Sequence, residues 1–330
     1  MEIAKRQIGR TSLEVTTLGL GGATLGGVAD VTTAQARATA EAGYRAGIRY
    51  FDTAPQYGYG KSERIVGDEL RDHANFVLST KVGRLLRPIR KPQPVGDIWH
   101  EPLPFEPVYD YSFDGVMRSY EDSLQRLGLD RIDIVFVHDP DVYVRETNQP
   151  NDAFLRAIDG AYTALDALRA SGAIKAIGLG VNDAQPIADV LPRGQWDCFL
   201  LAGRYTLLEQ APIHSLFPAV ARHGASIIIG GPFNSGILAG RDTWNYTRAP
   251  QDVRDRVDAM ARICAARGVS LAAAALRFPL AHPVVASTIP GPRSAAEVGQ
   301  ILAWWNAPIP AALWQDMKAE GLIDAEAPVP

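Results

Sequence analysis

The sequence has few cysteines, no long apolar run and no excess of charge of either sign. Its 330 residues include two cysteines, Cys198 and Cys264, too few for a disulfide framework or a zinc-binding pattern, so we expect no metal site. The amino terminus lacks the apolar core of a signal peptide, and no apolar stretch reaches the roughly 18 residues that a membrane-spanning helix needs. These absences predict a cytoplasmic protein with no membrane partner.

The charges that are present nearly cancel. Lysine and arginine total 33 and aspartate and glutamate total 37, which gives a formal net charge of −4 and no polycationic surface for nucleic acid. Hydrophobic residues make up 47% of the chain, enough for a large core. We therefore expect a globular protein whose partner is a small molecule; the sequence does not indicate its oligomeric state.

Strand and helix patterns alternate along most of the chain, after an amino-terminal β-hairpin whose turn is expected at residues 9–11. Eight short apolar segments are predicted to be strands: 17–20, 50–52, 76–80, 132–138, 174–179, 198–201, 226–229 and 284–288. Helix-length segments lie between them, including 33–46, 114–127, 152–170, 251–266 and 271–280. Eight strand-helix units imply parallel strands that close into a (β/α)8 TIM barrel, which we interpret as one domain over residues 1–330.

Two insertions interrupt this alternation. Residues 84–113 contain six prolines, and a shorter insertion covers residues 139–151. Both follow a strand, and in such barrels the active site lies at the carboxyl ends of the strands. We expect long substrate-binding loops at the carboxyl face; a pair of variable surface loops is the alternative.

Three predicted strands end in a charged or titratable residue, although a buried parallel strand should be apolar throughout. They end at Asp52, Lys81 and His138, and Tyr57 follows the first of them by five residues. Strand ends converge at the mouth of a barrel, so these four side chains are predicted to meet there. The alternative is an ordinary Asp52–Lys81 ion pair beside a packing histidine.

Such a cluster has a chemical use. A tyrosine hydroxyl has a pKa of about 10, too high for proton exchange at neutral pH unless a nearby cation such as Lys81 favours the phenolate. Asp52 would hold the ammonium in place, and His138 would fix a substrate oxygen. We therefore predict a proton-transfer site.

These residues resemble the active-site motif of the aldo-keto reductase family. The motif stands here as Phe51-Asp52-Thr53-Ala54-Pro55-Gln56-Tyr57-Gly58, and Lys81 and His138 match the family's lysine and histidine. The resemblance covers nearly the whole chain, to a helix at residues 294–304. It implies hydride transfer between a nicotinamide and a carbonyl or alcohol carbon, with Tyr57 as proton donor in reduction or acceptor in oxidation.

The resemblance also implies a cofactor site beside the last two strands. Residues 230–238 match the family's pyrophosphate loop and residues 288–294 its adenosine-phosphate segment. Asn182 resembles the asparagine that binds the nicotinamide amide. The expected cofactor contacts are Gly22, Thr24, Asn182, Phe233, Asn234, Ser235, Gly236, Leu238, Gly291, Arg293 and Glu297.

Departures from the family pattern bear on the cofactor. An NADP-dependent member carries a lysine at Gly291 and an arginine at Glu297, so the missing charges favour NAD, while Arg293 leaves NADP as an alternative. The family's nicotinamide-stacking aromatic is replaced by Gly230. This change predicts a nicotinamide pocket that is wider, or closed by Phe233 or Tyr205.

Residues 200–208 and 231–236 resemble the aldose 1-dehydrogenases and the related pyridoxal 4-dehydrogenases, two groups that oxidise a cyclic hemiacetal to a lactone. The resemblance implies NAD-dependent oxidation at C1 of an aldose such as L-fucose, D-arabinose or galactose, with Tyr57 as general base. Alternatives are pyridoxal oxidation to 4-pyridoxolactone, a generic aldehyde reductase, and a non-enzymatic redox-sensing regulatory subunit. Candidate substrate contacts, for which packing is a comparable explanation, are Trp99, His100, Tyr143 and Arg204.

Overall fold

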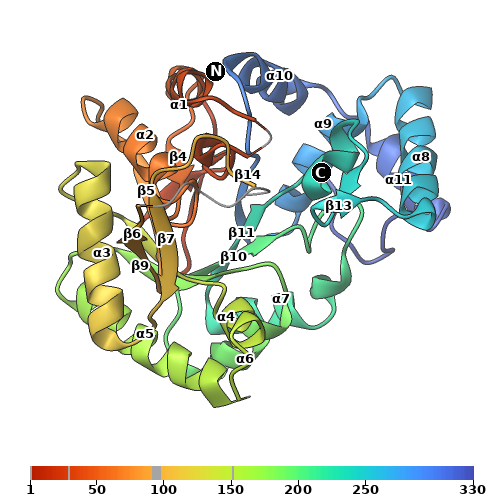
Figure 1. Cartoon of the computed structure of the whole chain (residues 1–330). Helices are drawn as coiled ribbons and strands as arrows, with labels where there is room; N and C mark the ends of the chain where they lie inside the picture. The colour runs from red at the N-terminus through yellow and green to blue at the C-terminus, as the bar shows by residue number, and fades with distance from the viewer. Residues whose placement is uncertain (1, 29, 91–97, 151) are drawn as a thin grey trace.

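Eight parallel strands form the centre of the molecule (Figure 1), as a computed structural model describes it for residues 2–28, 30–90, 98–150 and 152–330. Their order around the sheet is β3 (Leu20–Gly21), β4 (Tyr50–Asp52), β5 (Val77–Val82), β8 (Ile134–His138), β9 (Ala176–Val181), β10 (Cys198–Ala202), β11 (Ser226–Gly230) and β14 (Val285–Ile289). A parallel bridge between Leu18 and Thr288 joins the first strand to the last. The predicted (β/α)8 barrel is therefore confirmed.

A helix follows each barrel strand and covers its outer face (Figure 1). These helices are α1 (Thr33–Arg45), α2 (Lys61–Leu70), α3 (Phe113–Leu127), α5 (Asp152–Ala170), α6 (Gln185–Val190), α7 (Leu216–His223), α9 (Leu271–Arg277) and α10 (Ala295–Asn306). Two more, α8 (Gln251–Ala266) and α11 (Ala311–Ala319), pack on each other. Short 3-10 turns are η1 (Thr24–Gly26), η2 (Leu191–Arg193), η3 (Ala211–Ile213), η4 (Asn234–Ala239) and η5 (Phe278–Ala281).

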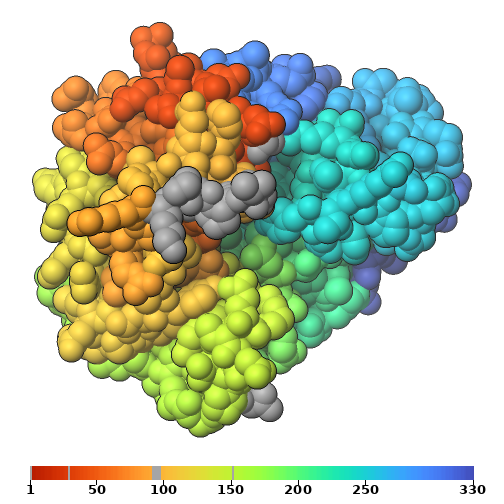
Figure 2. All heavy atoms as spheres, in the orientation of Figure 1, coloured from red at the N-terminus to blue at the C-terminus, as the bar shows by residue number. Residues whose placement is uncertain are grey.

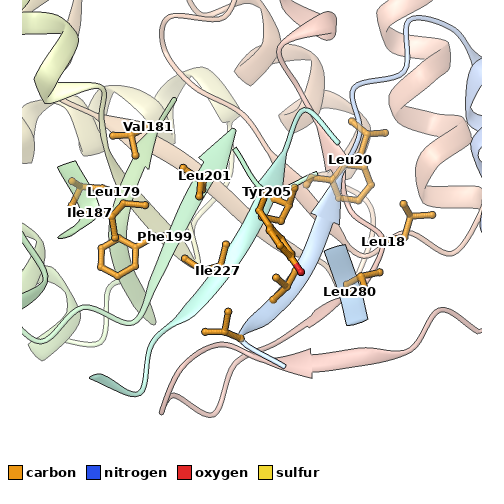
Figure 3. Close-up of a cluster of buried hydrophobic side chains, with 14 of the residues drawn as sticks. Leu18, Leu20, Leu179, Val181, Ile187, Phe199, Leu201, Tyr205, Ile227 and Leu280 are labelled. Atoms are coloured by element: carbon orange, nitrogen blue, oxygen red, sulfur yellow. The ribbon is translucent and has the colours of Figure 1, made fainter. Parts of the chain in front are cut away.

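Alternation along the strands divides the apolar residues into two layers. In β8, Val135 and Val137 belong to the cluster between strands and helices, whereas Ile134 and Phe136 face the lumen. Figure 3 shows the outer layer, in which Phe199 and Leu201 of β10 lie beside Ile227 of β11. Both faces of each strand are thus buried, which explains why the strands read as continuous apolar runs.

The amino-terminal hairpin closes the lower end of the lumen. Its strands are β1 (Lys5–Gln7) and β2 (Glu14–Thr16), paired antiparallel. Ile8, Leu13 and Val15 are buried against residues that begin the barrel strands, including Ile134 and Cys198. The hairpin therefore forms an apolar floor beneath the barrel.

The two insertions lie at the opposite end. The first contains an antiparallel hairpin of β6 (Arg84–Pro88) and β7 (Phe105–Tyr109), with residues 91–97 outside the described part of the chain. The second contains the short helix α4 (Pro140–Glu146). A third small hairpin, β12 (Thr243–Trp244) and β13 (Thr247–Arg248), follows β11. Figure 2 shows a hollow between these elements, with α4 at its lower end.

Within the described ranges, no single helix is long and apolar enough to cross a membrane. Residues 251–266 and 271–281 meet the length and composition criteria only as a pair that is bent by 100°.

Candidate active site

A buried ion pair lies at the carboxyl ends of β4 and β5. Lys81 is 1% exposed, and its Nζ donates to Asp52 Oδ2 at 2.7 Å and to the Thr53 carbonyl at 2.9 Å. Ser79 donates to the other Asp52 oxygen at 2.7 Å. Burial acts to lower the pKa of Lys81, but the charges of Asp52 and Tyr57 outweigh it and raise that pKa. Lys81 is therefore a fixed cation.

Tyr57 lies directly beside this cation. The Lys81 Nζ is 4.6 Å from the centre of the Tyr57 ring. Burial raises the pKa of Tyr57 to about 12, and the Lys81 charge acts in the opposite direction. The His138 ring stands edge-on to it, with ring centres 5.9 Å apart. The four side chains predicted to meet at the barrel mouth are thus brought together.

His138 is a neutral imidazole in this setting. It is 6% exposed, and burial, with the charges of Arg84 and Lys81, holds its pKa well below the usual value. Its Nδ1 is buried without a hydrogen-bond partner. A buried nitrogen without a hydrogen-bond partner is unusual in a folded protein.

The residues predicted to contact substrate are in different settings. Trp99 is buried, and its ring centre is 6.0 Å from that of Tyr57. The His100 carbonyl accepts from Lys61 at 2.9 Å, and the His100 ring is half-buried. Tyr143 packs against the rings of both Tyr109 and Tyr111. Of these three described residues, Trp99 is the one whose ring lies beside the proton-transfer cluster.

Arg204, the fourth predicted substrate contact, is held within the loop after β10. Its Nε donates to the Asn182 carbonyl at 2.8 Å, and its Nη1 donates to Glu209 at 3.0 Å and to the Asn245 side chain at 3.0 Å. The guanidinium therefore orders the Asn182 loop, and its predicted contact with substrate stays a prediction.

The start of the barrel contributes two of the predicted cofactor contacts. At Gly22 a Cβ would stand 2.5 Å from the Asp52 carbonyl, so glycine is required by the neighbouring strand. Thr24 donates to the Pro292 carbonyl at 2.7 Å and lies against Gly291. Residues that are distant in sequence thus form one wall of the mouth.

The loop after β11 contains the residues predicted to contact the pyrophosphate. The backbone passes from Phe233, with φ of −97°, to the left-handed conformation at Asn234, with φ of 46°. It remains left-handed through Ser235 and Gly236. Such a change of hand forms a concave nest of N–H groups. Two of the N–H groups are already bonded within the loop, that of Asn234 to the Gly231 carbonyl at 3.0 Å and that of Gly236 to the Phe233 carbonyl at 2.9 Å. The pyrophosphate contact of this loop, which includes the buried Leu238, therefore stays a prediction.

One expectation about the nicotinamide pocket is wrong. Tyr205 is fully buried in the outer layer, packed on Phe217 and Phe278, because its ring fills space between the barrel and its helices (Figure 3). It therefore cannot close the pocket. Phe233 packs edge-on against Trp304 of α10, with ring centres 5.7 Å apart.

The segment predicted to contact the adenosine phosphate carries a charge cluster at the start of α10. Arg293 donates to Glu297 through its side chain at 2.8 Å and through its backbone at 2.8 Å, and Arg241 reaches the same carboxylate at 3.3 Å. Burial acts to raise the pKa of Glu297, but its bonds to Arg293 outweigh this and lower it. The carboxylate is thus neutralised by two arginines, one of which the sequence prediction missed.

Comparison with known proteins decides the family. The chain matches the aldo/keto reductase family model over residues 17–320. It belongs to the aldo-keto reductase family. It is similar to pyridoxal 4-dehydrogenase of Microbacterium luteolum, at 45% identity over 97% of this chain and 98% of the relative, and to D-threo-aldose 1-dehydrogenase of Pseudomonas sp, at 36% identity over 94% and 95%. A solved structure, the holo form of aldo-keto reductase AKR11C1 from Bacillus halodurans, has a TM-score of 0.75 at 26% identity, with coverage of 99% and 98%.

This aldo-keto reductase has a second ion pair at its mouth that sequence reasoning did not find. Arg84 donates to Asp139 Oδ2 at 3.0 Å, and both residues are buried. Asn182 donates to Asp139 Oδ1 at 3.3 Å. Lys81 was identified because it is a charged residue at the end of a strand. Asp139 meets the same criterion, so the sequence could have identified it as well.

Proposed function

We propose that this aldo-keto reductase oxidises the hemiacetal carbon of a cyclic substrate to a lactone, with NAD as the preferred cofactor and Tyr57 as general base. The observation that carries the proposal is the buried cation beside Tyr57: Lys81 is fixed by Asp52 at 2.7 Å and lies 4.6 Å from the tyrosine ring. A fixed positive charge favours the phenolate that a base requires.

The residues would act in the following way. The Tyr57 oxygen takes the proton of the hemiacetal hydroxyl, while Lys81 stabilises the phenolate before the transfer. Neutral His138 holds the same substrate oxygen through hydrogen bonding. A nicotinamide held beside this cluster would supply the hydride acceptor. The hemiacetal carbon loses the hydride, its bond to the deprotonated hydroxyl oxygen becomes the lactone carbonyl, and its bond to the ring oxygen is kept.

Two substrate types fit this chemistry. The name of the relative at 45% identity supports pyridoxal, and the name of the relative at 36% identity supports an aldose such as L-fucose, D-arabinose or galactose. The rings of Trp99 and Tyr57 lie side by side with centres 6.0 Å apart, and an aromatic wall of this kind suits both a pyridine ring and the C–H face of a sugar. Direct measurement must therefore choose between them.

The charge cluster on α10 supports NAD as the preferred cofactor. Glu297 already engages Arg293 and Arg241, so neither guanidinium is free for a 2′-phosphate. A carboxylate at this position also accepts hydrogen bonds from free ribose hydroxyls. The cofactor would be held by the nest at Asn234, by Asn182 and by this cluster.

The test is the initial rate of NADH and NADPH formation with pyridoxal, L-fucose, D-arabinose, L-galactose, D-galactose and L-xylose. We expect NADH formation with pyridoxal or a sugar, and a loss of at least about 100-fold in Tyr57→Phe. Tyr120→Phe is the matched control, because Tyr120 lies on α3 and bonds the Ala173 carbonyl. If no substrate is oxidised while NADH still binds, the lactone-forming reaction is rejected.

A further inference from the structure

Asp139 has an unusual position for a carboxylate. It follows His138 directly, is 8% exposed and adopts a left-handed backbone with φ of 44°, while its N–H donates to the Gly180 carbonyl at 3.0 Å. Aspartate tolerates this conformation better than most residues, but burial of its charge is costly. A costly placement of this kind is typical of a functional site.

The Asp139 carboxylate joins three parts of the mouth. Oδ2 lies 3.0 Å from Arg84 Nη2 and 3.4 Å from His138 Nε2. Oδ1 accepts from Asn182 Nδ2 at 3.3 Å. One carboxylate thus contacts a residue of the proton-transfer cluster and the predicted nicotinamide-amide residue.

An ionised carboxylate only accepts hydrogen bonds, and this property fixes the orientation of both neighbours. Asn182 must turn its NH2 group to Asp139, which leaves its Oδ1 facing the mouth, where the Tyr246 hydroxyl donates to it at 3.2 Å. The same carboxylate, 3.4 Å from His138 Nε2, favours the tautomer with its proton on that nitrogen.

We propose that Asp139, held by Arg84, is a positioning residue that fixes His138 and Asn182 in one shared geometry for hydroxyl and nicotinamide binding. Arg84 keeps the carboxylate ionised by proximity, and Tyr111 supports the turn through its hydrogen bond to the His138 carbonyl at 2.6 Å. The effect of Asp139 on catalysis rests on the proposed function. Its effect on cofactor binding does not depend on that function.

This role makes the reaction sensitive to pH. Burial raises the pKa of Asp139 to about 6, against the charges of Arg84 and Lys81. Protonation makes the carboxyl a donor as well as an acceptor, so kcat/KM falls as the pH drops through about 6. The titratable groups that face it from the neighbouring elements are Tyr57, Lys81, Arg84, Tyr109, Tyr111, His138, Asp141 and Tyr246.

The test is Asp139→Asn, whose side chain is similar in size and does not titrate. We expect kcat to fall by about 10- to 100-fold, as for other residues that orient a reactive group. NADH binding, measured by quenching of protein fluorescence, weakens several-fold because the Asn182 amide is no longer fixed. The acidic limb of kcat/KM near pH 6 disappears.

Two further variants separate positioning from folding. Asp197→Asn removes the partner of Arg169 at the opposite end of the barrel, and it is expected to leave kcat and the pH profile unchanged. If Asp139→Asn fails to fold because Arg84 is left buried and unpaired, the double variant Arg84→Met with Asp139→Asn removes both charges. A folded variant that keeps both the acidic limb and wild-type NADH affinity overturns the proposal.

The two proposals fail in different ways. If the wild type oxidises no member of the substrate panel, the lactone-forming reaction is wrong, and the NADH titration of Asp139→Asn still tests the positioning role. If the wild type is active and the variant equals it in kcat, pH profile and NADH affinity, only the positioning role is wrong.

Discussion

Burial raises the pKa of Tyr57 to about 12, although the charge of Lys81 acts to lower it. A general base needs the phenolate, and Lys81 is the cation in contact with the Tyr57 ring that favours it. The rate of the reaction should therefore depend on the charge of Lys81 more strongly than on its size.

Lys81→Met should show this dependence. Without the ammonium the Tyr57 pKa rises further, so kcat/KM at neutral pH falls by about 100-fold or more and its alkaline limb moves to higher pH. Lys175→Met is the control, because Lys175 is half-exposed and pairs with Asp133 away from Tyr57. An alkaline limb that does not move would show that Lys81 does not control the tyrosine.

Glu297→Ala should change cofactor preference. Release of Arg293 and Arg241 from the carboxylate leaves two cations for a 2′-phosphate, so we expect KM for NADP to fall about 10-fold, equivalent to about 1.4 kcal/mol. KM for NAD should change less. The measurement is the ratio of the two KM values, and Arg293→Ala in the same background should reverse the gain.

Among the elements, the amino-terminal hairpin is expected to matter for stability alone. Ile8 is fully buried in the floor, so Ile8→Ala should lower the free energy of unfolding by about 2–5 kcal/mol through lost burial and a residual cavity. Glu14→Ala, on an exposed position of the same hairpin, should change it by less than about 0.5 kcal/mol. Urea unfolding measures both, and kcat of the folded variants should stay unchanged.

Elements with strong local signals were predicted well. The helix at 152–170 and the strand at 50–52 have the predicted bounds, because apolar periodicity and a following turn define them. The segment 271–280 divides into α9 and a 3-10 turn since Pro279 has no N–H to continue an α-helix. The observed ends of several strands differ from the predicted ends by a few residues, because pairing with neighbouring strands determines where a strand ends.

Parts of the site that depend on tertiary contacts could not be predicted. The proton-transfer residues were found because charge at a buried strand end is rare. The pairing of Arg84 with Asp139, of Arg204 with Asn245 and of Arg241 with Glu297 joins residues from segments that are distant in the sequence. No local pattern specifies which loop reaches which, so these contacts appear only once the barrel is closed.

At the scale of the whole molecule, barrel closure between Leu18 and Thr288 couples the first strand to the last. We expect one cooperative unfolding transition for the chain, and NADH at 100 times its Kd should raise the free energy of unfolding by about 2.7 kcal/mol. NADPH at the same concentration should raise it less. Calorimetry with each cofactor checks this, and two separate transitions would contradict a single domain.

Both cysteines of the chain are buried. Different elements must move before a reagent can contact each thiol. Cys198 lies in the lumen above the hairpin floor, and burial raises its pKa well above the usual value, whereas Cys264 lies on α8, outside the barrel. The labelling rates of the two thiols therefore report two different opening events in the unmodified protein. Cys264 should react when α8 detaches, and Cys198 only when the barrel itself opens.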